Sequence, residues 1–149
     1  MGKREPIRRV VDWPEYDELV SHICAQIGDK PIDCIVGLTR GGLVPAVRLS
    51  HFFNAKLFCL NISLRDGMVD DQEFDWDKLQ EYSNILIVDD INDSGKTLTE
   101  VMEQCYERLI QCPEFAVLLE KPSSSFRVRY SGERINKAKE NDWIVFPWE

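Results

Sequence analysis

The sequence lacks the features that mark several common classes of protein. Its five cysteines are odd in number and include no C-x-x-C pair, so they indicate neither a disulfide framework nor a zinc site. No apolar stretch reaches the length of a transmembrane helix, and no apolar run follows the first residues. We therefore expect reduced thiols and a cytoplasmic protein.

Basic residues are also scarce. Lysine and arginine number 18 against 26 aspartates and glutamates, which gives a formal net charge of −8 and a pI near 4.8. Because Lys and Arg drive binding to nucleic acids and anionic membranes, we expect neither partner. A polyanionic substrate would need a divalent cation and local cationic groups to offset repulsion by this chain.

The length and the order of the elements indicate an α/β fold. A chain of 149 residues with 44% hydrophobic composition is long enough for one well-packed domain, which we place at 1–149. Strand and helix signals alternate as in βαβ units. The expected strands are 33–38, 56–62, 85–88 and 115–119; the expected helices are 13–27, 43–53 and 95–110; and a polar loop is expected at 63–77.

The most informative stretch is Ile85–Thr97, with the sequence ILIVDDINDSGKT. Four apolar residues predict a buried parallel strand that ends where the acids begin, so Asp89 and Asp90 should lie at its carboxyl end. Ligands bind at that edge of open α/β sheets. The following Ser-Gly-Lys-Thr would begin a helix whose free backbone N–H groups can bind a phosphate. The stretch predicts a site for a phosphorylated sugar.

Two other interpretations of this stretch were considered. A nucleotide-triphosphate P-loop requires a glycine five positions before Gly95, but Asp90 stands there and would repel a triphosphate. The acids could also cap a helix and solvate a loop, as acids near helix starts often do. Three acids in this register beside a phosphate-binding turn favour a ligand site.

A second turn, Thr39–Pro45, also joins an apolar strand to a helix and should lie at the same sheet edge. Its adjacent glycines allow backbone amides to bind an anion, and Arg40 can add a forked cationic donor suited to pyrophosphate. A Gly-Gly pair between strand and helix can equally be structural.

Together these motifs resemble the type I phosphoribosyltransferases, whose motif has four apolar residues, two acids, two apolar residues and Asp-x-Gly-x-Thr. Only Asn92 departs from it. The resemblance implies a mainly parallel twisted sheet flanked by helices, with a small C-terminal hood segment. It also implies that the chain binds phosphoribosyl pyrophosphate (PRPP) with Mg²⁺ as cofactor. The implied PRPP ligands are Arg40, Gly41, Asp89, Asp90, Asp93, Ser94, Gly95, Lys96 and Thr97, with Asp89 at the metal.

The end of the chain resembles the bacterial xanthine-guanine enzymes within that family. Lys121, after the strand 115–119, corresponds to a lysine that donates to the exocyclic oxygen of a purine. In the tail 142–149, Trp143 corresponds to a tryptophan that stacks on the base, with Ile144 beside it. A solvated lysine and a tryptophan that packs the last strand are the plainer alternatives for these positions. Trp148 could be a core or interface residue.

The resemblance implies transfer of phosphoribosyl from PRPP to a 6-oxopurine (guanine, xanthine or hypoxanthine), which yields a nucleoside 5′-monophosphate and pyrophosphate. Asp93 is then the candidate general base, since it can accept the N7 proton. A homodimer or homotetramer is implied as well. A transferase for another nucleobase, and a PRPP-binding regulator without transferase activity, remain alternatives.

Overall fold

The computed structural model describes residues 4–62 and 74–149. Its strands are β1 (Arg8–Val10), β2 (Cys34–Thr39), β3 (Lys56–Asn61), β4 (Ile85–Asn92), β5 (Glu114–Glu120), β6 (Tyr130–Arg134) and β7 (Trp143–Val145). Its helices are α1 (Trp13–Ile27), α2 (Leu43–Phe53) and α3 (Lys96–Glu107), with 3₁₀ helices η2 (Trp76–Glu81) and η3 (Lys137–Lys139). None of the described helices is both long and apolar enough to span a bilayer.

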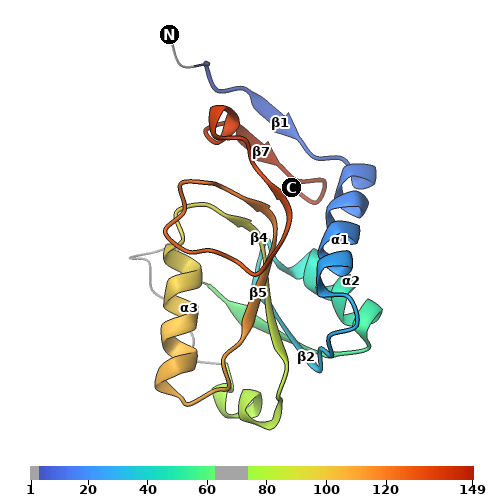
Figure 1. Cartoon of the computed structure of the whole chain (residues 1–149), viewed down its shortest axis with the longest axis vertical. Helices are drawn as coiled ribbons and strands as arrows, with labels where there is room; N and C mark the ends of the chain where they lie inside the picture. The colour runs from blue at the N-terminus through green and yellow to red at the C-terminus, as the bar shows by residue number, and fades with distance from the viewer. Residues whose placement is uncertain (1–3, 63–73) are drawn as a thin grey trace.

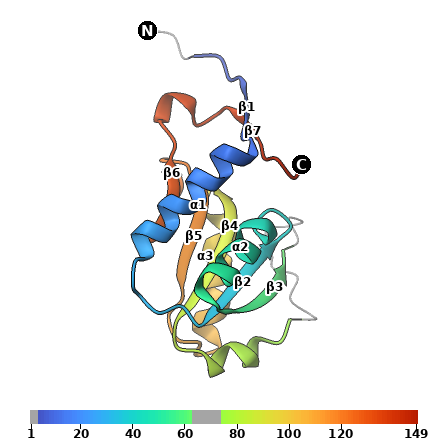
Figure 2. The same ribbon diagram turned by 90° about the vertical axis from the view of Figure 1, so that its right-hand side faces the viewer.

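The main sheet has five parallel strands in the order β3-β2-β4-β5-β6. Helices cover both of its faces: α1 and α2 lie on one side and α3 on the other (Figures 1 and 2). Side chains of β4 alternate between the layers, as the pleat requires. Leu86 and Val88 pack with α1 and α2, whereas Ile85 and Ile87 pack with α3 and η2. The predicted parallel α/β fold is confirmed.

The first helix begins and ends where its sequence predicts. The Glu15 N–H donates to Asp12 Oδ1 at 2.9 Å, so Asp12 caps the helix, and Pro14 occupies its first turn, where no N–H is needed. Gly28 terminates the helix with φ +60°, a value that glycine adopts without strain. This helix packs on β5 and β6 and carries the chain from β1 to the start of the main sheet.

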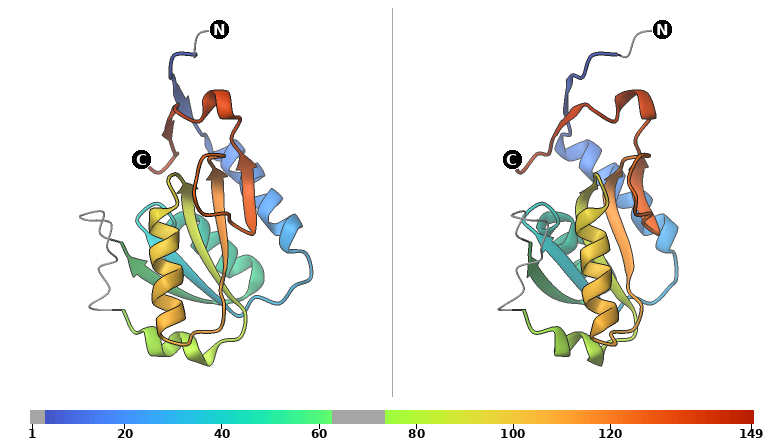
Figure 3. Two further views of the ribbon diagram at one scale, coloured as in Figure 1. Left: turned by 60° about the vertical axis from the view of Figure 1, so that its left-hand side comes forward. Right: turned by 90° about the vertical axis from the view of Figure 1, so that its left-hand side faces the viewer.

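A second, two-stranded parallel sheet joins the two ends of the chain. In it, β1 pairs with β7, with Arg8 opposite Trp143 and Val10 opposite Val145. This hood (β1 and β7) lies at the end of the molecule toward which the strands of the main sheet run (Figure 3). The hood is therefore made of N-terminal as well as C-terminal residues, whereas a C-terminal segment alone was expected.

Three predicted boundaries were wrong. The strand predicted at 85–88 continues to Asn92, because β5 supplies partners for the acidic residues: Asp89 pairs with Val117 and Asn92 with Glu120. The acids thus lie within the strand rather than after it. The helix predicted to reach 110 ends at Glu107, and Leu109 adopts φ 55°. Part of the loop predicted at 63–77 lies outside the described residues, and η2 already begins at Trp76.

No strand was predicted in the tail, where β7 lies, and two further strands, β6 and β1, were not predicted either. β6 lies in the segment 123–139, and its charged, mixed sequence gives no apolar run. It is an edge strand that pairs only with β5 among the described strands. β1 is three residues long and its Arg-Arg-Val sequence has no strand pattern of its own. Both strands depend on pairing with distant segments.

Candidate active site

The turns after β2 and β4 meet at the carboxyl edge of the main sheet. These strands are neighbours, with Val36 opposite Ile87 and Gly37 opposite Val88. Between the turns and the tail lies a hollow of about 940 Å³. It is lined by Leu38, Thr39, Arg40, Gly41, Asn61, Ile62, Asp89, Asp90, Ile91, Asp93, Thr97, Trp148 and Glu149.

The turn after β2 packs directly on the acidic pair. The Thr39–Arg40 peptide bond is cis. A Cβ on Gly41 would stand 2.1 Å from Asp90 Oδ2, and one on Gly42 would stand 2.3 Å from the Val88 carbonyl oxygen. Both glycines are therefore required for close approach between the turns, whatever anion they bind. Arg40 is exposed and lines the hollow.

The acidic pair is partly buried and carries unbalanced negative charge. The Asp90 N–H donates to Asp89 Oδ1 at 2.8 Å, and the Ile91 N–H donates to Asp90 Oδ1 at 2.7 Å. Burial raises the pKa of Asp89 well above its usual value, and the neighbouring Asp90 raises it further. Burial likewise raises the pKa of Asp90. A cation bound here would relieve this unfavourable burial of charge.

The described residues fit a magnesium ion that is shared with a substrate. The lining contains four acidic side chains, those of Asp89, Asp90, Asp93 and Glu149, against the single cation Arg40. Carboxylate oxygens suit Mg²⁺, which is commonly held by one or two carboxylates together with water and substrate phosphates. No group of three or more potential metal ligands occurs within 4–62 and 74–149.

The turn at 94–97, for which phosphate binding was predicted, leads into α3 as the sequence indicated. Gly95 precedes the first residue of α3 and has φ +93°. A side chain there would meet the Phe126 backbone nitrogen at 2.7 Å and the Ser124 Oγ at 2.8 Å. Thr97 faces the hollow from the first turn of the helix. The first N–H groups of α3 and the positive end of its dipole point toward the sheet edge.

Asp93 and Lys121 form an ion pair across the ends of β4 and β5, with Lys121 Nζ 2.8 Å from Asp93 Oδ1. The Lys121 side chain is only 17% exposed, whereas that of Asp93 is 69% exposed. The two residues were proposed for different tasks from distant parts of the sequence. The fold brings them together because β4 and β5 are adjacent parallel strands that end at the same edge.

The tail residues separate into an exposed and a packed group. Trp143 is 73% exposed on the hood, and Ile144 packs against the core that α1 and α2 cover. Trp148 lines the hollow, and its ring stacks on Phe146 with 4.9 Å between centroids. It also meets Tyr16 edge-on at 5.6 Å. The aromatic cluster fixes the tail beside the acidic pair.

Seven residues that line the hollow were not among the predicted site residues: Leu38, Thr39, Asn61, Ile62, Ile91, Trp148 and Glu149. Asn61 ends β3 and Ile62 follows it. Because β3 ends at the same edge as β2 and β4, the parallel order of the strands would have indicated both residues. Ile91 lies in the extension of β4 that was expected to be a loop. Glu149 reaches the hollow only because Trp148 is held in the aromatic cluster, and no local pattern signals that.

Comparison with known proteins agrees with this architecture. The sequence profile of the "Phosphoribosyl transferase domain" family matches residues 8–149, and the chain belongs to that family. A xanthine-guanine phosphoribosyltransferase of Cereibacter sphaeroides is 34% identical over 129 residues, which cover 77% of this chain and 68% of the relative. The enzyme of the same name from Chromohalobacter salexigens is 27% identical over 93% of this chain and 82% of its own length.

Solved structures show the same fold. A purine phosphoribosyltransferase from Pyrococcus horikoshii Ot3 is 29% identical, with a TM-score of 0.74 over 95% of this chain and 94% of that one. The xanthine-guanine-hypoxanthine phosphoribosyltransferase of Helicobacter pylori gives a TM-score of 0.73 at 19% identity, which shows a shared fold.

Proposed function

We propose that this protein transfers the phosphoribosyl group of PRPP to a 6-oxopurine in purine salvage, with Mg²⁺ as cofactor. The products are a nucleoside 5′-monophosphate and pyrophosphate. The family membership supports phosphoribosyl transfer, and the purine relatives support the class of acceptor. The assignments of Arg40, Gly41, Asp89, Asp90, Asp93 and Thr97 are supported by their positions around the hollow. Those of Lys121, Trp143 and Ile144, which do not line it, rest on the family resemblance and, for Lys121, on its ion pair with Asp93.

The phosphate groups of PRPP would bind at the two turns. The 5′-phosphate is assigned to Asp93–Thr97, which supplies the amides at the start of α3, the hydroxyl groups of Ser94 and Thr97, and Lys96. The pyrophosphate is assigned to Arg40 and Gly41. Asp89 and Asp90 would hold the ribose hydroxyls and the metal. Bound Mg²⁺ would neutralise charge on the departing pyrophosphate.

The Asp93–Lys121 pair is the observation that carries the choice of acceptor. Along one edge of a 6-oxopurine, N7–H is a donor and O6 is an acceptor, whereas adenine presents an amino group at position 6. A carboxylate and an ammonium group 2.8 Å apart offer the complementary acceptor and donor. Asp93 would receive the N7 proton as the glycosidic bond forms, and Lys121 would hold O6. Trp143 and Ile144 would complete the base site from the hood.

Incubation with PRPP, Mg²⁺ and single nucleobases tests this function. We expect nucleoside monophosphates from guanine, xanthine or hypoxanthine, and little from adenine or orotate, as measured by liquid chromatography. The Asp93→Asn variant controls for contaminating enzymes. PRPP binding without product from any base would instead support a regulator, and product from orotate alone would identify a different transferase.

We further propose a cytoplasmic homodimer or homotetramer. The described cysteines form no disulfides, as expected in a reducing compartment. Leu43, Val47 and Phe52 of α2 are exposed apolar side chains, with Phe52 at 65%, and they are available for subunit contacts.

A further inference from the structure

A second pair of polar residues lies directly behind Asp93 and Lys121. Asn92 and Glu120 are opposite each other in the β4–β5 register, each one residue before a member of the ion pair. They are 1% and 5% exposed. Burial of an acid and an amide at this depth is costly unless their polar atoms are hydrogen-bonded.

The two side chains bind each other and the loop that follows β5. Asn92 Nδ2 donates to Glu120 Oε2 at 3.1 Å and to the Phe126 carbonyl oxygen at 2.7 Å. The same Glu120 Oε2 accepts the Val128 N–H at 2.9 Å. Ser124 Oγ donates to Asn92 Oδ1 at 2.8 Å. The loop 121–128 is thus fastened to the buried pair near both of its ends.

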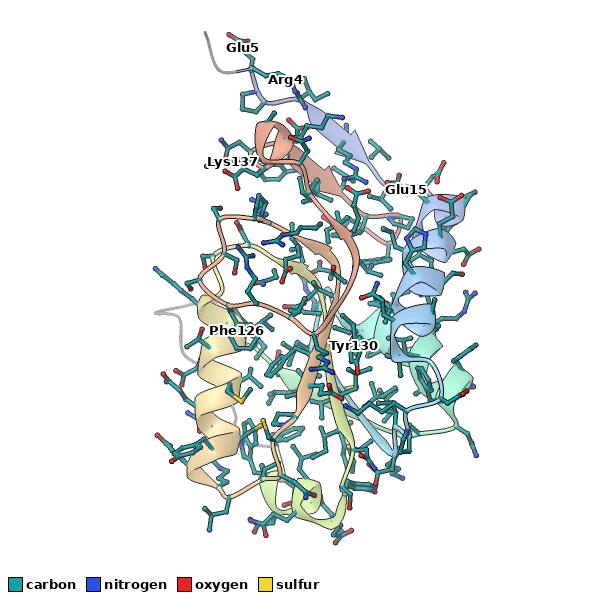
Figure 4. All side chains as sticks on the ribbon, viewed as in Figure 1. Arg4, Glu5, Glu15, Phe126, Tyr130 and Lys137 are labelled. Carbon is teal, nitrogen blue, oxygen red and sulfur yellow. The ribbon has the colours of Figure 1, made fainter. Side chains whose placement is uncertain are left out.

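The same loop also touches the phosphate-binding turn. The Ser125 N–H and Oγ both donate to the Ser94 carbonyl oxygen, at 3.0 and 2.9 Å. Gly95 has no room for a side chain because the backbone at Phe126 and the Ser124 hydroxyl lie against it. Phe126 lies beside α3 (Figure 4), and its ring packs edge-on against Phe115 at 4.8 Å. The loop therefore bridges the phosphate side and the base side of the site.

Asn92 is also the one residue that departs from the phosphoribosyltransferase motif, which carries an apolar residue there. Two apolar residues would fill positions 92 and 120 without the desolvation of a carboxylate, so the polar pair is not needed for packing. The polar pair instead adds directional hydrogen bonds, between its two side chains and to the loop 121–128.

We propose that Asn92 and Glu120 are positioning residues, which hold the loop 121–128 against the phosphate-binding turn and thereby set Asp93 and Lys121 for the purine edge. The Lys121 N–H donates to the Asn92 carbonyl oxygen at 3.0 Å, so the backbone links the two pairs directly. This inference rests on the proposed function, because it assigns positioning residues to the proposed base site.

Two substitutions of Glu120 separate hydrogen bonding from charge. A glutamine keeps one oxygen, which can accept both the Asn92 and the Val128 donors, since both now bind Oε2. Glu120→Ala removes that acceptor. We expect Glu120→Ala to raise the KM for the base and lower kcat, about 10- to 100-fold in kcat/KM, with the KM for PRPP little changed. Glu120→Gln should restore most of the lost activity.

Two further variants test whether Glu120→Ala lowers activity merely by destabilising the protein. Glu114→Ala, at the opposite end of β5, breaks the ion pairs with Lys30 and Arg129 and should affect stability without separating the two KM values. Asn92→Leu/Glu120→Leu replaces both partners with apolar groups, which preserves folding but removes the anchors of the loop. It should reproduce the selective rise in the base KM even if Glu120→Ala fails to fold.

Hydrogen exchange of the Lys121 and Val128 amides provides a readout that does not depend on activity. Faster exchange in Glu120→Ala or in the double variant, with protection regained in Glu120→Gln, supports the positioning role. Unchanged exchange overturns it. Equal rises in both KM values, or a Glu120→Gln variant as impaired as Glu120→Ala, also overturn it. A wild-type protein that makes no product refutes the proposed function, and exchange then decides the structural claim alone.

Discussion

The proposed phosphate side of the site takes its polar groups from two short stretches of sequence, whereas the proposed base side takes them from segments that lie far apart. Thr39–Gly42 and Asp89–Thr97 each span the end of one strand and the turn that follows it. Lys121 follows β5, and Trp143 lies in the hood, which forms only when β1 pairs with β7. Substitutions on the phosphate side should therefore change PRPP binding, and those on the base side should change selection of the acceptor.

The largest expected effect is that of substituting Asp93, the proposed general base. Asp93→Asn keeps the size and the capping ability of the residue but removes the proton acceptor, so turnover should fall by about 10²- to 10⁴-fold while PRPP still binds. Steady-state kinetics and calorimetric titration with PRPP measure the two quantities. Asp29→Asn, at an exposed turn after α1, is the matched control. Near-normal turnover in Asp93→Asn would remove Asp93 from this role.

Gly41→Ala should damage the phosphate side selectively. The new methyl group would stand 2.1 Å from Asp90 Oδ2, so either the turn or the carboxylate must move. We expect PRPP affinity to fall by about tenfold or more, since reactant groups must be held closely in place. Gly28→Ala makes the same change at φ +60° with open space around it. It should cost about 1 kcal/mol of stability without loss of PRPP affinity.

Alanine substitutions of Trp143 and Trp148 should affect different properties, the first base binding and the second the stability of the fold. Trp143 is 73% exposed, so Trp143→Ala should leave the melting temperature nearly unchanged while it raises the KM for the base about tenfold through lost stacking. Trp148→Ala should instead cost about 1–3 kcal/mol of unfolding free energy, because its ring packs against Phe146 and Tyr16. Thermal denaturation beside base-dependent kinetics measures both. The base side would need a different assignment if Trp143→Ala left the KM unaltered.

The smallest expected effect is on the pH dependence of stability, to which Asp89 of the acidic pair contributes. The folded-state pKa of Asp89 is raised, so its contribution to stability declines as the pH rises from the ordinary value of 3.8 through the raised pKa. Above that pKa the destabilisation is complete. Asp89→Asn should therefore raise the melting temperature of the unliganded protein by a few degrees at neutral pH, and the gain should vanish in acid.

The same variant should lose most of the stabilisation that PRPP and Mg²⁺ give to the wild type. Melting curves over a range of pH, with and without these ligands, provide both comparisons. A variant that melts below the wild type at neutral pH without ligand would contradict the assigned cause of the pKa shift.

The contrast between neighbouring and distant segments also explains which regions the sequence predicted well. Four apolar residues before Asp89 were enough to place β4, and the glycines at 41, 42 and 95 marked both turns. The end of β4 could not be predicted, since Asp89–Asn92 are held as strand by pairing with β5. β1 and β6 could not be predicted for the same reason, because their mixed sequences become strands only by pairing with a distant segment.

The polar supports of the site were also beyond local reasoning. Asn92 is visible in the sequence as a departure from a motif, but nothing near it indicates Glu120, 28 positions further along, as its partner. Lys121 was placed by family resemblance, and its 2.8 Å contact with Asp93 follows from the strand order.

The most direct test is a competition among acceptors. Wild-type protein is supplied with PRPP, Mg²⁺ and equal amounts of guanine, xanthine, hypoxanthine, adenine and orotate, and the nucleoside monophosphates are quantified by mass spectrometry. Nucleotides of 6-oxopurines should dominate, and Asp93→Asn should abolish them. If adenine or orotate nucleotides dominate, or if no nucleotide forms although PRPP binds, the assignment of Asp93 and Lys121 to a 6-oxopurine edge is contradicted.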